Sequence, residues 1–358
     1  MKIPEIILLP PNRVWRTYLG GKVLDSIQNN HNPADTHFPE DWIASTTAAV
    51  NKGREEFKEE GLSKIEINDS TEILKSLMER FPVEMLGEKH FKKYGAKTQF
   101  LLKFLDSSIR LHIQAHPTIQ FAQKYLNSNS GKTEAYVILG IRDEVKEPYI
   151  HLGFQKQIEP EEFKKIISDQ DIPQLLSCFE KIPVTPGDVF IVPGGLPHAI
   201  GEGVFMIEIM EPTDFVVRFE FERGGYVLPE EARFMGRGVD FAIDMIDFTK
   251  RQAEQIKQNY FCHSRLLTKQ SEGEENILID EKQTPCFSVH QLKIKEHFTK
   301  IADSFYVGIV TKGNGTISAG SLKTNLKQWD KFFIPFKTKE VEFASSDEME
   351  VVLTFPPK

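Results

Sequence analysis

The segment IRLHIQAH, residues 109–116, alternates apolar and polar side chains. Successive side chains on a strand point to opposite faces, so the alternation predicts a strand with Arg110, His112, Gln114 and His116 on one face. Taken alone, the segment is typical of a half-exposed strand with its polar face in water. Two histidines and a glutamine are unusual on such a face, however. Alternate positions on a strand are roughly 6.5–7 Å apart, so Gln114 and His116 can both lean toward one ion.

A metal site on this strand needs further ligands, because catalytic zinc usually takes three or more from the protein. Glu134 stands in GKTEAYVILG, directly before an apolar strand, and His198 stands in a Pro/Gly turn within VPGGLPHAIGEG. Alone, Glu134 is equally consistent with a surface carboxylate, and His198 with a structural histidine. Together with Gln114 and His116 they form a coherent set of nitrogen and oxygen ligands. Such a set suits one zinc ion, but also manganese, cobalt or iron.

Arg218 lies on a second alternating segment, FVVRFEFE at residues 215–222. It occupies the face opposite to the phenylalanines, so it has the same parity as the polar residues of 109–116. One interpretation is a functional cation in the same pocket. The other is a surface ion pair with Glu220 or Asp214, and the segment alone does not decide between them.

The elements that must position these side chains are expected to be mainly strands. Regions rich in Phe, Val and Ile and broken by Gly and Pro have the spacing of a β-sandwich or barrel. These regions are residues 97–116, 134–155, 184–222, 286–310 and 316–354. Apolar side chains at helical spacing predict helices within 69–93, 159–180 and 229–257. The polar stretch 268–284 is expected to be an exposed loop or weak strand rather than core.

Two short stretches, GDVFIVP at 187–193 and WDKFFIP at 329–335, indicate an internal repeat. Each has an Asp followed five residues later by Pro, across an apolar strand. The first copy continues to His198, ten residues after Asp188, whereas the corresponding position in the second is Glu340 and no histidine follows it. We therefore expect two related β-barrels, of which only the first keeps a metal ligand.

The bulk composition excludes several classes of protein. A formal net charge of −8 over 358 residues argues against nucleic-acid or anionic-membrane binding, although a few local Lys and Arg residues suffice for a phosphate. The three cysteines, Cys178, Cys262 and Cys286, include no CxxC pair and fit a reducing cytoplasm better than a disulfide scaffold. No apolar run has the length of a signal peptide or a membrane span. A monomer or weak dimer is expected.

Several motifs together resemble the class I mannose-6-phosphate isomerases, which are zinc enzymes of the cupin superfamily. They are NRVWR-YLGG, LLKFLD leading into IQAHP, GKTE, PGDVFIVPGGLPHAIGEG and IEIMEPTDFVVRFEFER, and they span most of residues 11–223. The resemblance implies a mainly β protein with two cupin (jelly-roll) barrels and helical segments. The expected division is a metal-binding domain at 1–228 with insertions near 69–93 and 159–180, a helical connector at 229–260, and a degenerate barrel at 261–358.

The resemblance also implies roles for individual residues. Zinc is expected to be bound by Gln114, His116, Glu134 and His198, the four residues reached from ligand chemistry. Lys132 is expected to face the active site. Arg218 matches the family's catalytic arginine, and Asp214 matches its carboxylate partner.

The implied reaction is the interconversion of mannose 6-phosphate and fructose 6-phosphate through an enediolate. The metal would polarise the carbonyl, Arg218 would stabilise the oxyanion, and Lys132 would assist proton transfer or bind an anionic sugar oxygen. His112 is either a base or, more in keeping with its place, a hydrogen-bonding residue behind the ligands.

The chain departs from the family in the pocket, which leaves the exact sugar open. His112 stands where the family usually has Ser, Gly131 where some members have His, and EDWIAST (Glu40–Thr46) where GESWE-S is more common. Two other classes therefore stay open, namely a cupin dioxygenase and a non-catalytic sugar-binding cupin.

Overall fold

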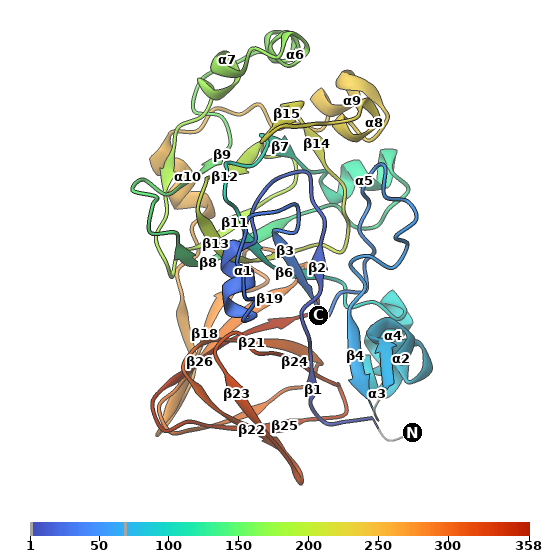
Figure 1. Ribbon diagram of the computed structural model, residues 1–358, viewed down its shortest axis with the longest axis vertical. Helices are drawn as coiled ribbons and strands as arrows, with labels where there is room; N and C mark the ends of the chain where they lie inside the picture. Colours follow the sequence, from blue (N-terminus) through green and yellow to red (C-terminus); the bar gives the residue numbers. More distant parts are fainter. Residues whose placement is uncertain (1–2, 68–69) are drawn as a thin grey trace.

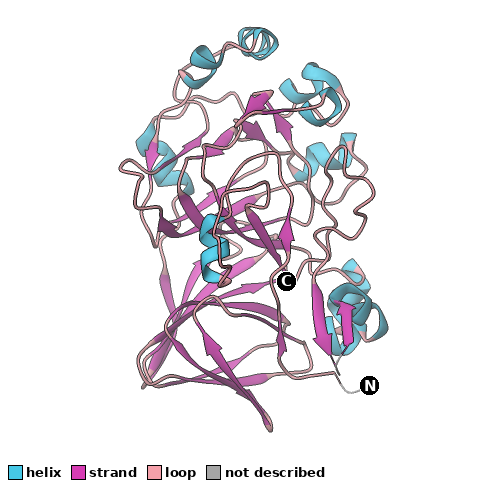
Figure 2. Ribbon diagram, viewed as in Figure 1, coloured by secondary structure: helices cyan, strands magenta, loops and turns pink. Residues whose placement is uncertain are grey.

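The structure is a computed structural model that describes residues 3–67 and 70–358. Strands form two β regions, one above the other, and most helices lie around the upper region (Figures 1 and 2). The expected class, mainly β with helical insertions, is confirmed. None of the described helices is long and apolar enough to cross a membrane.

The upper β region consists of two antiparallel sheets. The first has the order β11-β8-β13-β6-β3-β2, with β2 (Arg13–Val14), β3 (Glu40–Ile43), β6 (Leu101–Asp106), β8 (Glu134–Ile141), β11 (Val189–Val192) and β13 (Val204–Met210). The second has the order β10-β9-β12-β7-β14, with β7 (Gln114–Ala115), β9 (Tyr149–Leu152), β10 (Ile182–Pro183), β12 (His198–Ile200) and β14 (Val217–Arg218). Apolar side chains of both sheets share one buried cluster, so the sheets face each other across a core.

The lower β region repeats this plan. Its first sheet has the order β1-β24-β21-β26-β19-β18-β17, with β1 (Ile7–Leu8), β17 (Arg265–Gln270), β18 (Gly273–Ile279), β19 (Ser288–Ile294), β21 (Tyr306–Lys312), β24 (Lys331–Ile334) and β26 (Met349–Phe355). Its second sheet has the order β20-β25-β22-β23, with β20 (His297–Ile301), β22 (Asn314–Ala319), β23 (Leu322–Lys327) and β25 (Glu340–Ala344). These two sheets also enclose a shared apolar core.

The repeat seen in the sequence has a matching backbone in the two regions. Asp188 and Asp330 each accept a hydrogen bond from the backbone N–H three residues earlier, at 2.7 and 2.9 Å. The residue before each Asp has a positive φ, 96° at Gly187 and 74° at Trp329. The same turn therefore introduces β11 in the upper region and β24 in the lower region.

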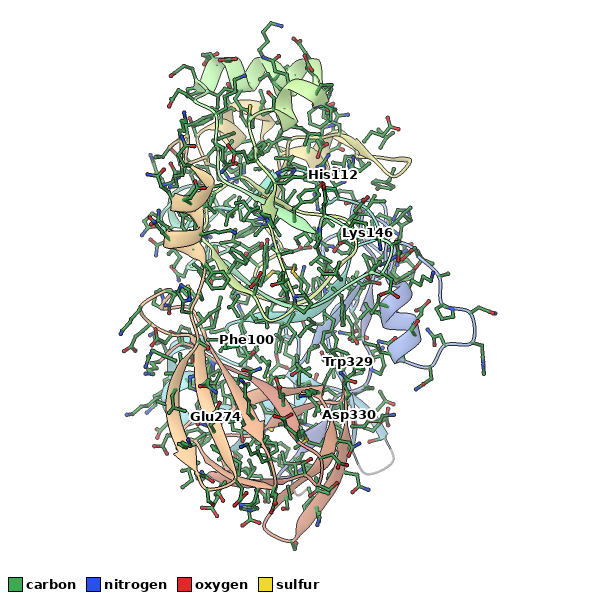
Figure 3. The ribbon with its side chains drawn as sticks, turned by 90° about the vertical axis from the view of Figure 1, so that its left-hand side faces the viewer. Phe100, His112, Lys146, Glu274, Trp329 and Asp330 are labelled. Carbon is green, nitrogen blue, oxygen red and sulfur yellow. The ribbon has the colours of Figure 1, made fainter. Side chains whose placement is uncertain are left out.

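The two regions are joined by an apolar and a charged contact (Figure 3). The indole of Trp329 packs edge-on against Phe104 and Phe205, with ring centroids 6.0 and 5.4 Å away. Lys331 of β24 forms a buried 2.6 Å ion pair with Asp41 of β3. In addition β1, from the start of the chain, pairs with β24. The division at residues 228 and 260 stays a prediction.

The helices fall largely where the apolar spacing places them. Within or beside the expected ranges lie α2 (Leu74–Arg80), α3 (Pro82–Leu86), α4 (Glu88–Tyr94), α6 (Pro160–Asp169), α7 (Ile172–Leu176), α8 (Glu230–Arg233), α9 (Gly238–Ile243) and α10 (Ala253–Tyr260). Outside them lie α1 (Lys22–Ile27) and α5 (Ile119–Tyr125). The first expected range begins at residue 69, outside the described residues. It continues not as helix but as β5 (Ser70–Ile73), because this segment pairs with β4 (Lys64–Ile67) in a hairpin.

Two local expectations are corrected by the structure. The stretch 268–284 is not excluded from the core, since it contains all of β18, whose Leu278 and Ile279 are buried. The segment 109–116 is extended but belongs to a sheet only at Gln114–Ala115. One reason is that the N–H of Ile113 donates to the side chain of Glu220 at 2.7 Å instead of to a strand.

Candidate metal centre

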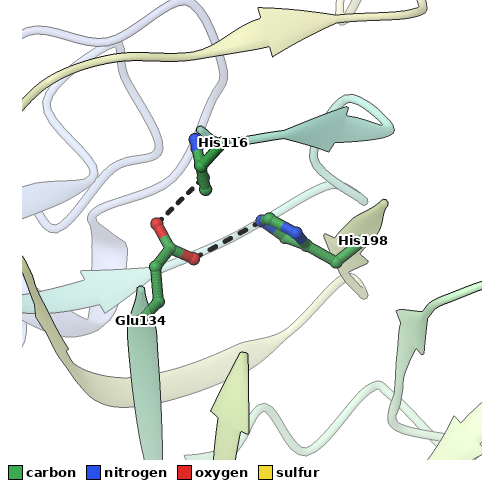
Figure 4. A group of neighbouring side chains, drawn as sticks. All are labelled: His116, Glu134 and His198. Carbon is green, nitrogen blue, oxygen red and sulfur yellow. Dashed lines mark ion pairs between the residues drawn. The ribbon is translucent and has the colours of Figure 1, made fainter. Parts of the chain in front are cut away.

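The four expected ligands lie on neighbouring strands of the upper region. Gln114 of β7 is paired with His198 of β12, and His116 follows directly after β7. Glu134 is the first residue of β8. One ligand atom each from His116, Glu134 and His198 lies within 4.8 Å of the others, and all three residues are buried (Figure 4). The polar face of residues 109–116 therefore faces the interior and not water.

Backbone carbonyls fix the orientation of both imidazoles. Nδ1 of His116 lies 2.8 Å from the carbonyl oxygen of Phe215, and Nδ1 of His198 lies 2.8 Å from that of Leu196. A carbonyl only accepts, so in each ring Nδ1 carries the hydrogen and Nε2 presents a lone pair. These lone pairs point at Glu134, whose Oε1 is 2.9 Å from Nε2 of His116 and whose Oε2 is 3.4 Å from Nε2 of His198.

Acceptor atoms that face one another at these distances fit a bound cation. Oε1 of Glu134 is buried and receives no well-aligned hydrogen bond from the described residues, although Nζ of Lys132 lies 3.1 Å away. Burial lowers the pKa of His116 to about 3, so the ring is neutral, as metal binding requires. Two neutral imidazoles and a carboxylate match the ligand types that zinc takes in catalytic sites. The residues present therefore fit the metal that the resemblance implies.

Gln114 lies at the edge of this cluster. Its Nε2 is 3.4 Å from Nε2 of His198. Rotation of the amide by half a turn would place Oε1 at this position, because the two amide atoms have nearly the same shape. Gln114 can thus serve as a fourth ligand without a change in the backbone.

Lys132 is the residue that brings positive charge into the cluster. Its Nζ lies 3.1 Å from Oε1 of Glu134 and 3.4 Å from Nε2 of His116. Burial alone would raise the pKa of Glu134, but His116 and Lys132 bring it well below its usual range. The carboxyl is therefore ionised and available to a metal.

Arg218 faces the same pocket, but its partner differs from the expected one. The carboxylate of Asp214 is bound by Arg16, through two hydrogen bonds of 3.0 Å, and not by Arg218. Arg218 donates only to the carbonyl of Ala232, at 3.1 Å, among the bonds between described residues. Burial and the nearby charge of Arg16 lower its pKa to about 10, which still leaves the guanidinium charged at neutral pH.

A layer of buried charges lines the pocket between the two sheets and was missed from the sequence. Nζ of Lys103 lies 3.0 Å from Oε1 of Glu40 and 2.7 Å from Oε2 of Glu208. Burial raises the pKa of Glu208 to about 8, and the nearby charges of Glu134 and Glu40 add to this rise, which Lys103 offsets only in part. A signal was present: Glu208 is the one charged residue of the apolar strand β13, and Lys103 lies among apolar residues in the fully buried strand β6, where an unpaired charge is rarely found.

His112, which lies in the upper region (Figure 3), is buried and lines the pocket. Its Nδ1 lies 3.0 Å from the carbonyl oxygen of Glu220. Burial and the charge of Arg218 lower its pKa to about 3. At neutral pH a base of this pKa holds a proton too weakly to carry one between two carbons.

The pocket itself is narrow. Its cavity has a volume of about 20 Å³, and its lining includes Arg16, His112, Gln114, Lys132, Glu208 and Arg218. A wider cavity of about 710 Å³ lies between residues 52–55 and the segment that includes Tyr226 and Glu231. Two hydrogen bonds join residues near the two cavities in the sequence. The N–H of Val50 donates to Asp214, and Arg218 donates to the carbonyl of Ala232.

Comparison with known proteins bears on this arrangement. A curated mannose-6-phosphate isomerase from Streptococcus mutans is 24% identical over 277 residues, which is 76% of this chain and 79% of the relative. The chain resembles the mannose-6-phosphate isomerases over most of its length. The resemblance expected from the motifs is thus confirmed. No protein-family model matches the chain.

Solved structures show the same fold. The mannose 6-phosphate isomerase from Bacillus subtilis superposes with a TM-score of 0.72 at 18% identity, covering 98% of this chain and 99% of the other. A zinc-bound mannose 6-phosphate isomerase superposes with a TM-score of 0.72 at 15% identity, covering 99% of this chain and all of the other. Both likenesses extend through the upper and lower regions.

Proposed function

We propose that the chain is a zinc-dependent aldose–ketose isomerase that interconverts mannose 6-phosphate and fructose 6-phosphate. The observation that carries the proposal is the convergence of lone pairs from His116, Glu134 and His198 beside a cationic pocket. The curated relative from Streptococcus mutans carries the name of this activity, and one solved neighbour is zinc-bound. Both are in keeping with this reading.

The reaction moves a proton between C1 and C2 of the sugar. Bound by His116, Glu134, His198 and Gln114, a zinc ion would polarise the substrate carbonyl and offset the charge on its oxygen. Arg218 lies in the pocket with no carboxylate bonded to it among the described residues, so its charge is free to stabilise the enediolate oxygen.

We assign the proton transfer to Glu208 rather than to His112. Glu208 lines the pocket, and its pKa of about 8 is close to neutrality, where a group both takes and returns a proton readily. Lys132 would bind an anionic sugar oxygen, since its ammonium group is buried at the pocket wall beside Glu134. These roles of Arg218, Lys132, Glu208 and the four ligands are proposals.

The cellular setting belongs to the same proposal. All three cysteines are free thiols, which suits the reducing cytoplasm. The substrate would be a phosphorylated hexose, and neither nucleic acid nor membrane is expected as a partner.

Metal removal tests the proposed function directly. Protein dialysed against a chelator should lose the conversion of mannose 6-phosphate to fructose 6-phosphate, and stoichiometric zinc should restore it. Full activity in protein shown by elemental analysis to be metal-free would refute the mechanism. Oxygen uptake that depends on ferrous ion, with no isomerisation, would instead identify a dioxygenase.

A further inference from the structure

The ring of His112 is held in one tautomer by the chain around it. Nδ1 must carry the hydrogen, because its neighbour at 3.0 Å is the carbonyl oxygen of Glu220, which can only accept. Glu220 is itself fixed, since both its carboxylate oxygens accept hydrogen bonds of 2.6 Å from the guanidinium of Arg110. Nε2 of His112 therefore presents a lone pair, and the ring cannot easily turn.

That lone pair has no partner in the described part of the chain. Nε2 of His112 is fully buried, and the residue is only 2% exposed. A buried acceptor without a donor destabilises the folded protein. Such atoms are rare in folded proteins and need an explanation. Since His112 lines the same narrow pocket as Gln114 and Arg218, a bound ligand is the explanation that fits.

The chemistry of the missing partner follows from the tautomer. A bare imidazole nitrogen accepts, so its partner must donate. A sugar hydroxyl donates a hydrogen, whereas the oxygens of a phosphate dianion only accept and would be repelled by the lone pair. The cavity of about 20 Å³ has room for roughly one water-sized group, which is the size of a hydroxyl.

We propose that His112 is a specificity-determining residue, whose Nε2 accepts a hydrogen bond from one non-reacting hydroxyl of the sugar, away from its phosphate. This inference rests on the proposed isomerase function. It places a sugar hydroxyl, and not the phosphate, at Nε2 of His112 in the narrow pocket.

The test compares sugars that lack one hydroxyl. Reaction at C1 and C2 leaves the hydroxyls at C3, C4 and C5 of the open-chain sugar to be probed, with 3-deoxy, 4-deoxy and 5-deoxy mannose 6-phosphate. The wild-type enzyme should lose roughly 10- to 100-fold in kcat/KM on one of the three, because the buried nitrogen is then left unpaired. The His112→Phe variant has a ring but no acceptor. In it, the ratio of kcat/KM on the intact sugar to kcat/KM on that deoxy sugar should fall to about threefold or less. His112→Gln retains an acceptor oxygen and should keep part of the ratio.

His151 offers a matched control. It is also a buried histidine whose Nδ1 donates to a backbone carbonyl, that of Glu180 at 2.9 Å, but it does not line the narrow pocket. His151→Phe should leave the deoxy-sugar ratios unchanged. If His112→Phe fails to fold, His112→Leu and His112→Gln give the same comparison.

Two results would overturn the inference. One is that each deoxy sugar lowers kcat/KM, relative to the intact sugar, by the same factor in the wild type and in His112→Phe. The other is a tenfold weaker inhibition by inorganic phosphate in His112→Phe, which would show that His112 faces phosphate. An enzyme that does not isomerise mannose 6-phosphate refutes the proposed function instead. In that case, binding calorimetry on the zinc-loaded protein compares the intact sugar with the deoxy sugars. Equal affinities for all of them would refute the role of His112.

Discussion

Asp214 is bound by Arg16, which lies 198 positions earlier in the chain, and not by Arg218, which lies four positions later. The two hydrogen bonds and the burial of both side chains fix Arg16 in place. Arg218 consequently keeps its charge in the pocket without a carboxylate partner in the described chain. The Asp–Arg spacing in TDFVVR thus marks two residues of one site that are not bonded to each other.

Replacement of Arg218 by Ala should lower kcat by about 10²–10³-fold, the effect of removing one preorganised donor from a developing oxyanion. Zinc content should be unchanged, because Arg218 meets Gln114 only through backbone strand pairing, and its side chain donates to the carbonyl of Ala232 and to none of the four expected ligands among the described residues. Arg251→Ala, which removes an ion pair with Asp247 elsewhere, is the control. Normal turnover in Arg218→Ala would make it a structural residue.

Replacement of Arg16 by Gln should both destabilise the fold and slow the reaction. Removal of one partner leaves the charge of Asp214 buried and unpaired, at a cost of about 3–5 kcal/mol. Asp214 is then free to turn to Arg218 and neutralise it. In the double variant Arg16→Gln/Asp214→Asn, denaturant unfolding should show that most of the stability has returned. A double variant no more stable than Arg16→Gln would contradict the pairing.

Glu208 should make the metal-free protein less stable as pH rises. Its pKa increases from 4.5 to about 8 in the folded state, so above pH 4.5 the unfolded chain releases this proton while the folded chain still holds it. Release favours unfolding, and the stability contributed below pH 4.5 is lost by about pH 8. In Glu208→Gln this loss should be absent, as measured by urea unfolding at pH 5 and pH 8. An equal change with pH in both proteins would show that Glu208 is not protonated.

The same substitution should also slow catalysis. If Glu208 carries the proton, Glu208→Gln should reduce kcat by roughly 10²–10⁴-fold with little change in bound zinc. The matched comparison is Glu72→Gln on β5, outside the pocket lining. Wild-type turnover in Glu208→Gln would move the base to another group.

Glu134→Gln should uncouple zinc from stability. In the wild type, zinc at a thousand times its Kd should stabilise the fold by about 4 kcal/mol, since it binds the folded state. The neutral amide is a weaker ligand, so zinc should raise the Tm of the variant much less. Elemental analysis should then find less than one zinc per chain. An unchanged zinc-dependent rise in Tm would place the metal elsewhere.

Trp329 tests the turn shared by the two β regions. A non-glycine residue at φ 74° is strained, whereas the first copy has Gly187 at this place. Both Trp329→Ala and Trp329→Gly lose the packing on Phe104 and Phe205 and should be less stable than the wild type. Trp329→Gly should nevertheless be more stable than Trp329→Ala by about 1 kcal/mol, because glycine relieves the backbone strain. The reverse order in thermal unfolding would contradict this.

The grouping of the expected ligand residues could be predicted from the sequence because they lie in short segments whose local structure is strong. Gln114 and His116 share an alternating segment, and His198 follows a Pro/Gly turn that opens a strand. The pairing of Arg16 with Asp214 could not be predicted, since it depends on how distant segments meet. The same limit explains the segment 109–116: its alternation is local, but the bond from Ile113 to Glu220 that ends the ladder is not.

The lower region has no ligand set like that of the upper region among its described residues, yet its strand β24 holds β1 and, through Lys331, Asp41 of β3. A ribosome that makes about 5–20 residues per second delivers β24 only tens of seconds after β1 has emerged. Until then Ile7 and Leu8 have no strand to pair with, and Asp41 has no cation. The start of the chain must therefore wait for nearly the whole chain before β1 is paired and Asp41 gains its cation. During that interval, the nascent protein exposes an unpaired edge that a chaperone would recognise.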